Sequence, residues 1–368
     1  MLIAGAASTC YMSLGMVVTW PNVLVSHLLK SNSTLLGKSI SLEPFHMDMA
    51  GSMMFIGSIP GYLLAGWLMS SVGRRWSIFI GALPSITGAA LIGMAVNPTM
   101  IITGRFLDGI TFGMMNVSVR SYIAEISDSE VRGRAGCIVN LTMQIGSILA
   151  VGLGILMAWY YVALIYGCIL IMHCILVIIL LPESPAYLAV TDKDERAIAV
   201  LSQLRGPSVD AISELKQLKT ENQQEDGNSG YRSLLKRDML QRMFVIFGLF
   251  FLCNFAGVQV LKANVSRILQ AFGLPFKNEI GAVIVICLFL FGSFTMMCVL
   301  DFIGRRHVLM ISLNIIAVSY GSLGAYVYFV EQGPHSFVGQ AVTISHNGSN
   351  STVMQTTHTR LVHIACRK

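Results

Sequence analysis

The sequence predicts an all-α membrane protein, and three observations support that fold class. Only 12% of the 368 residues are charged, whereas soluble globular proteins carry roughly 25%. Mean hydropathy is +0.67. Nine apolar stretches meet or approach the about 20 residues that a helix needs to cross a bilayer. They cover residues 2–29, 47–71, 77–96, 99–124, 135–159, 161–181, 243–261, 279–300 and 307–329.

Other classes of protein fit the composition poorly. The net charge of +6 comes from basic residues between apolar stretches, not from basic stripes with aromatics, so no nucleic-acid partner is expected. The eight cysteines form no CxxC pair and read as small apolar residues. The adjacent His173 and Cys174 favour packing over metal ligation, and no GxxxxGK[ST] nucleotide loop is present. We therefore expect neither an enzyme nor a bound metal or cofactor.

Basic residues recur in every second gap between the apolar stretches. Because positive charge concentrates on the cytosolic side, these gaps and the N-terminus are expected in the cytosol. The protein is thus predicted to be multi-pass, with the lipid bilayer as its surroundings and the plasma membrane as its location. The basic residues include Arg74, Arg75, Arg132, Arg134, Arg305 and Arg306.

Asparagine sequons agree with this orientation. Asn32, Asn347 and Asn350 each begin an Asn-x-Ser/Thr sequence and fall on the outer side, where N-glycans are added. These three asparagines are the predicted glycosylation sites.

The order of the segments predicts two halves. The text VGRRWS at 72–77 returns as IGRRHV at 303–308, as expected of an internal repeat. We expect a six-helix N-terminal half, a cytosolic helical linker, a partial second half and a polar tail. Their ranges are 1–181, 182–242, 243–330 and 331–368.

Charged residues inside apolar stretches are costly, and they usually face the bundle interior. Arg105 and Asp108 are spaced i, i+3 and are expected to meet on one helix face. Two roles are possible for this pair: an ion pair that packs the helices, or a part in moving solute or protons. Lys262 is expected to extend to the outer interface, with a cavity-lining position as the alternative.

Three motifs resemble those of the sugar porter family of the major facilitator superfamily. The stretch LDGITFGMMNVSVRSYIAEISDSEVR at 107–132 resembles the family's signature after helix 4, and LPESPAYL at 181–188 resembles its PESP motif. The paired GRR turns, with Asp301 before the second, resemble its loops after helices 2 and 8. The sequence is most similar in style to invertebrate facilitated trehalose transporters and animal glucose facilitators.

The resemblance implies facilitative transport of trehalose or a hexose by alternating access of two halves. It implies a sugar site with amide side chains, here Asn140, Asn254 and Gln259. It also implies an inner-face gating network that favours the outward-open state. The members of that network would be Arg74, Arg75, Glu125, Arg132, Glu183, Asp301, Arg305 and Arg306.

The departures from the family pattern leave alternatives open. Arg120 stands where the family usually has a proline, and Phe289 where it often has an amide. Family members have twelve spanning helices, so we expect an incomplete second half with the last three helices missing. One alternative is a non-transporting isoform, a sensor or a regulator that forms an oligomer with full-length homologues. The other is a proton-coupled symporter with Asp108 as carrier.

Overall fold

The computed structural model describes residues 2–28, 34–38, 40, 42–127, 132–205, 212–216, 219–220, 237–255, 257–258, 261–262, 264–265 and 278–332. Within these ranges every regular element is a helix, which confirms the all-α prediction. Five helices there are long and apolar enough to cross a membrane on these measures alone. They are Phe45–Ser71, Arg74–Gly93, Ala135–Leu156, Trp159–Leu180 and Ile280–Val299.

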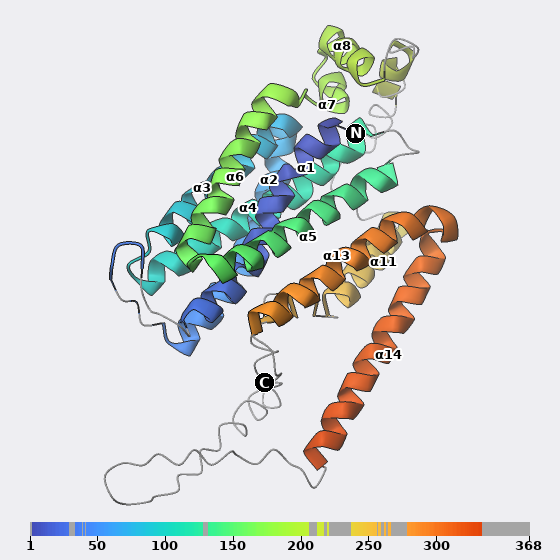
Figure 1. Ribbon diagram of the computed structural model, residues 1–368. Helices are drawn as coiled ribbons and strands as arrows, with labels where there is room; N and C mark the ends of the chain where they lie inside the picture. Colours follow the sequence, from blue (N-terminus) through green and yellow to red (C-terminus); the bar gives the residue numbers. More distant parts are fainter. Residues whose placement is uncertain are drawn as a thin grey trace, which may run out of the picture. The chain divides into compact units, whose positions relative to one another are not determined.

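The six predicted N-terminal helices form one bundle (Figure 1). Helix α4 packs between α2 and α3, while α1 packs against α5 and α6, and α3 also contacts α6. Helix α4 is absent from the five apolar spans, and it contains Arg105, Asp108, Arg120 and Glu125. The helices are α1 (Leu2–Leu28), α2 (Pro44–Ser71), α3 (Arg74–Gly93), α4 (Pro98–Ile126), α5 (Arg132–Leu156) and α6 (Trp159–Leu180).

Glycines set the close approach of α2 and α4. A Cβ added to Gly109 would meet the Met54 carbonyl oxygen and would lie 2.8 Å from the Gly57 Cα. A Cβ on Gly113 would likewise meet the Ser58 carbonyl oxygen and lie 2.8 Å from the Tyr62 nitrogen. Small residues allow such backbone contact where lipid provides no hydrophobic drive between helices.

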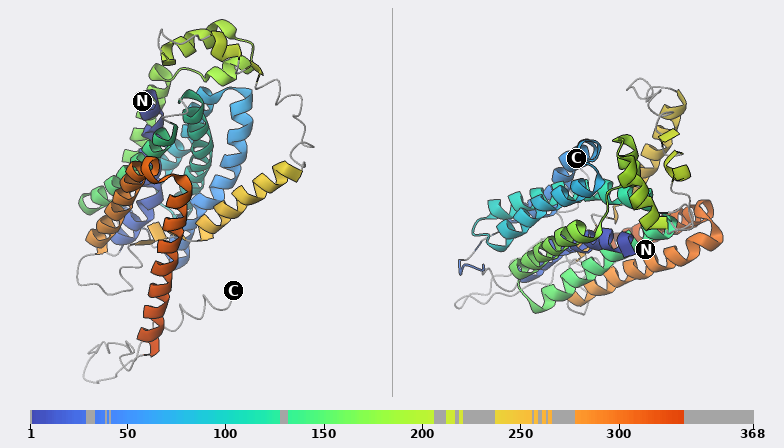
Figure 2. Two further views of the ribbon diagram at one scale, coloured as in Figure 1. Left: turned by 90° about the vertical axis from the view of Figure 1, so that its right-hand side faces the viewer. Right: turned by 90° about the horizontal axis from the view of Figure 1, so that it is seen from above.

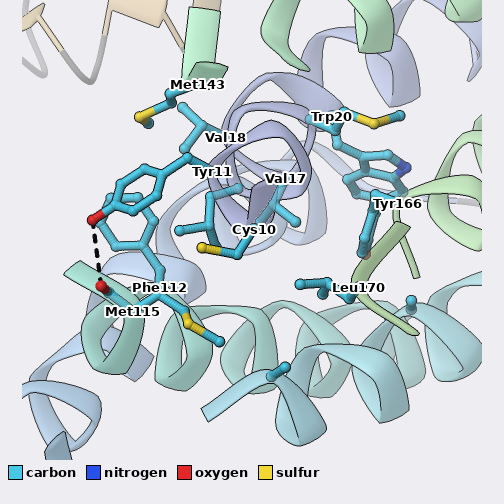
Figure 3. Close-up of a cluster of buried hydrophobic side chains, with 14 of the residues drawn as sticks. Cys10, Tyr11, Val17, Val18, Trp20, Phe112, Met115, Met143, Tyr166 and Leu170 are labelled. Carbon is cyan, nitrogen blue, oxygen red and sulfur yellow. Dashed lines mark hydrogen bonds between the residues drawn. The ribbon is translucent and has the colours of Figure 1, made fainter. Parts of the chain in front are cut away.

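Helix α1 lies at the centre of the buried core (Figure 3). The Tyr11 hydroxyl donates a hydrogen bond to the Met115 carbonyl of α4 at 3.3 Å. Further along α1, the Trp20 indole N–H donates to the Trp159 carbonyl of α6 at 3.0 Å. The aromatic side chains therefore bury apolar area while their polar atoms remain bonded.

After α6 the chain forms the short α7 (Pro185–Val190) and α8 (Asp194–Arg205). Their small core contains Leu188, Ala197 and Leu201, and Leu215 joins it. The Lys219 ammonium donates to Asp194 and Asp192, and these hydrogen bonds raise the pKa of Lys219 above its ordinary value. Both helices lie within 182–242, the range for which the sequence analysis expects a cytosolic helical linker.

Three longer helices follow, α11 (Arg237–Phe255), α13 (Asn278–Ile303) and α14 (Arg305–Gln332). The chain divides into two compact units, Met1–Met297 and Cys298–Lys368. In the first unit, Ala282 and Ile286 of α13 pack with Val151 of α5 and with Val265. The second unit contains α14, a continuous helix (Figure 2).

Candidate functional site

A cluster of charged side chains ties the end of α4 to the start of α3. The Arg74 Nε lies 3.1 Å from Glu125 Oε1, and both side chains are about four-fifths buried, with 22% and 18% exposed. The Ser121 hydroxyl donates to Glu125 Oε1 at 3.0 Å, and the Ser184 hydroxyl donates to Glu125 Oε2. Glu125 thus links α3, α4 and the PESP segment.

The Glu183 carboxylate, which belongs to neither α2 nor α3, binds the backbone where α3 begins, directly after the turn that follows α2. Its Oε1 accepts hydrogen bonds from the backbone N–H groups of Arg74 at 2.8 Å and Arg75 at 3.0 Å. These are orphan donors at the first turn of α3, where negative charge is favoured. Gly73 has φ 101°, and a Cβ there would lie 2.6 Å from Glu183 Oε2. The glycine therefore meets two needs, the left-handed backbone and the close approach of the carboxylate.

The structure brings together Arg74, Arg75, Glu125 and Glu183 from the predicted network. It adds Ser184 and Tyr122, whose hydroxyl donates to the Pro182 carbonyl at 2.9 Å. Both residues lie in motifs already visible in the sequence. Arg306 is exposed on α14. The side chains of Arg132, Asp301 and Arg305 lie outside the described residues.

Arg105 and Asp108 form a second polar cluster, inside the bundle. Both are fully buried, with Arg105 Nη1 3.5 Å from Asp108 Oδ2. Arg105 also donates to the carbonyls of Ala50 and Val17, each at 2.8 Å. Asp108 accepts from the hydroxyl of Tyr166 at 3.0 Å and from that of Ser85 at 2.5 Å. These contacts join five helices and satisfy both charged groups.

A cavity of about 280 Å³ lies between α5 and α13. Asn140 is exposed on the α5 side, and its Oδ1 accepts from Arg120 Nη2 at 3.4 Å. One turn further along α5, the buried Gln144 has an Oε1 without a partner in the described residues. The cavity residues are Cys137, Asn140, Leu288, Phe289, Gly292, Ser293 and Met296.

The other predicted sugar-site residues do not join Asn140 in the described residues. Asn254 is exposed, and its Nδ2 donates to the Phe250 carbonyl of its own helix at 2.8 Å. Gln259 and the predicted glycosylation sites fall outside the described residues: Asn32, Asn347 and Asn350.

Lys262 is buried and does not extend to an interface as expected. Its Nζ lies 4.7 Å from the ring centroid of Phe289, which also lines the cavity, so the cavity-side alternative fits better. The ring face attracts the ammonium group. The sequence singles out Phe289 only because the family often has an amide side chain at this position. It does not predict the contact between Phe289 and Lys262.

A family model described as "Sugar (and other) transporter" matches residues 13–345. The facilitated trehalose transporter Tret1-2 homolog of Drosophila simulans is 29% identical over 287 residues, covering 77% of this chain and 59% of the relative. Tret1 of Apis mellifera ligustica is 28% identical over 291 residues, covering 77% and 58%. The chain thus spans less than two thirds of the length of these curated relatives.

The fold is that of solved transporters of the major facilitator superfamily. The xylose transporter XylE from E. coli, in a partially occluded inward-open conformation, matches with a TM-score of 0.69 and 18% identity. The match covers 91% of this chain and 80% of XylE. At this identity the likeness concerns the fold, since one fold hosts many functions.

Proposed function

Because the chain belongs to the sugar transporter family, we propose that it carries trehalose or a hexose across the plasma membrane by facilitative alternating access. The observation behind this proposal is the cavity of about 280 Å³ between α5 and α13, lined by Asn140 and Ser293. In transporters built from two halves, the substrate binds between helices of the two halves. The cavity supports the proposal because the sequence analysis assigns α5 to the first half and α13 to the second.

The side chains at this cavity suit the hydroxyl groups of a sugar. The Asn140 amide supplies both hydrogen-bond donors and an acceptor, and Ser293 supplies a hydroxyl. Asn254 and Gln259 are proposed to complete the site in another state of the cycle. Transport breaks no covalent bond and depends on how differently the two states bind the sugar.

Removing the Asn140 amide tests the sugar site. In oocytes with matched surface protein, Asn140→Ala should lower saturable uptake of labelled glucose or trehalose about tenfold at low concentration, because a directional hydrogen bond to the sugar is lost. Thr142→Ala on the same helix should leave uptake unchanged, because within the described residues its hydroxyl donates to the Ile138 carbonyl of its own helix. Equal uptake by the Asn140 variant and native protein would remove Asn140 from the site.

We also propose that the inner-face cluster stabilises the outward-open state. Arg74, Glu125 and Glu183 supply the contacts on the N-terminal side. Four further residues are proposed to complete the gate with Arg75. They are Arg132, Asp301, Arg305 and Arg306.

Glu183→Ala is expected to release this gate. It removes a carboxylate that accepts two backbone N–H groups of α3, contacts of a charge-assisted kind. Maleimide labelling of Cys137, in a variant with the other cysteines replaced, should become about tenfold faster from the cytosolic side. Glu195→Ala removes an exposed carboxylate of α8 and should leave the rate unchanged. An unchanged rate in Glu183→Ala contradicts the gating role.

Proton coupling is the second candidate, because Asp108 is a carboxylate buried within α4. A solved relative by fold is described as a proton:xylose symporter. Asp108 already accepts two hydroxyl hydrogen bonds and faces Arg105, which favours a packing role. Uptake driven by an imposed pH gradient would favour the symporter.

A further inference from the structure

Helix α4 carries two arginines in its predicted span, and they differ in their partners. Arg105 is buried and has the Asp108 carboxylate beside it. Arg120 is exposed, and within the described residues it contacts no carboxylate. An unpaired charge in a membrane span is costly and usually marks a functional position. Of the two arginines in α4, Arg120 is therefore the one without a counter-ion in the described residues.

The contacts of Arg120 hold it beside the cavity. Its Nε donates to the Tyr11 hydroxyl at 3.3 Å, and its guanidinium carbon lies 5.8 Å from the Tyr11 ring centroid. Its Nη2 donates to Oδ1 of Asn140, which lines the cavity, at 3.4 Å. Both partners are neutral, so they orient the guanidinium without neutralising it.

The guanidinium keeps donors for a ligand. Arginine has five N–H groups, and these two contacts use two of them, one on Nε and one on Nη2. The remaining N–H groups lie on the two terminal nitrogens, the edge that pairs with a planar carboxylate. Nearby, Asn140 and Ser293, which line the cavity, suit hydroxyl groups.

We propose that Arg120 makes this site selective for a sugar acid, a sugar that bears one carboxylate. One fixed positive charge matches a monoanion better than a phosphate group, whose charge near neutral pH approaches two. This inference rests on the proposed sugar site and names its substrate class. The relatives named above are described by neutral sugars, trehalose and xylose, so this chain would differ from them in charge preference.

Ligand binding to the purified full chain tests the proposal without depending on transport. Thermal stabilisation is measured with glucuronate, glucose and acetate over a range of concentrations. The native chain should bind glucuronate at least about tenfold more tightly than glucose, because the carboxylate gains charge-assisted hydrogen bonds. Arg120→Gln should abolish this preference. Arg196→Gln removes an exposed charge on α8 and should retain it.

Several results would overturn the proposal. They are equal binding of glucuronate and glucose by the native chain, a preference that survives in Arg120→Gln, or stabilisation by acetate as strong as by glucuronate. Arg120→Lys keeps the charge and provides a second variant if Arg120→Gln fails to fold; it should keep part of the preference. Surface protein that transports no sugar would contradict the proposed function. The preference for glucuronate is tested separately, by the binding measurement.

Discussion

Replacing Asp108 by alanine is expected to lower the free energy of unfolding by about 3–5 kcal/mol, because removing one partner leaves a buried charge uncompensated. Arg105 is 1% exposed, and Asp108 is the carboxylate beside it. The substitution also removes the acceptor of the Ser85 and Tyr166 hydroxyls. Thermal unfolding of the purified chain in detergent should show a large drop in Tm and in the yield of folded protein.

A double variant separates the charge effect from the loss of volume. Arg105→Met with Asp108→Leu removes both charges and keeps apolar bulk, and such replacements of buried pairs are often neutral or stabilising. The double variant should therefore recover more than half of the stability lost in Asp108→Ala. If Asp108→Ala changes stability by less than about 0.5 kcal/mol, the range of ordinary surface substitutions, the pair does not hold the bundle together.

Replacing Gly109 by leucine is expected to cause the second large loss. The new side chain would enter α2 at the Met54 carbonyl and the Gly57 Cα, where backbone atoms cannot rotate away. Overpacking costs typically 1–3 kcal/mol, and we expect at least about 3 kcal/mol here because the two helices must separate. Size-exclusion profiles and Tm of the purified variant measure this loss.

Gly66→Leu provides the matched control. Gly66 lies on α2, and a Cβ there meets no atom within 4 Å. The same substitution at this open position should leave Tm within a few degrees of the native value. Equal Tm values for the two variants would show that the contact of α2 and α4 is looser than the glycines indicate.

The helices of the first half are largely predictable because long apolar stretches end at recognisable residues. Pro98 begins α4, as expected of proline in a first helical turn. The sequence placed the start of the third span at residue 77, yet α3 begins at Arg74. Gly73 and Glu183 explain the difference, since the positive φ and the remote carboxylate allow the helix to start at the two arginines.

The inner cluster could be predicted in part because its residues lie in recognisable motifs. Arg74, Glu125 and Glu183 meet as the motifs indicate. Asn254 remains a prediction, because in this structure its side chain donates to the Phe250 carbonyl of its own helix. The buried Gln144, whose Oε1 has no partner in the described residues, was not singled out, although it lies four residues from Asn140, the spacing that places two side chains on one helix face.

The contacts of Arg120 could not be predicted from the sequence alone. The sequence marks it only as a departure from a usual proline. Its partners Tyr11 and Asn140 are 109 and 20 residues away along the chain, and only the packing of α1, α4 and α5 brings them together. The proposed charge preference of the site rests on that packing and not on any motif.

Uptake of labelled glucose and trehalose by surface-expressed native chain, without an imposed pH gradient, tests the central claim most directly. Glycosidase and surface labelling first establish that the protein reaches the plasma membrane. The proposed facilitator predicts saturable uptake that unlabelled sugar competes away and that falls about tenfold in Asn140→Ala. Native protein at the surface with no uptake above uninjected cells would contradict the proposal that this chain transports these sugars.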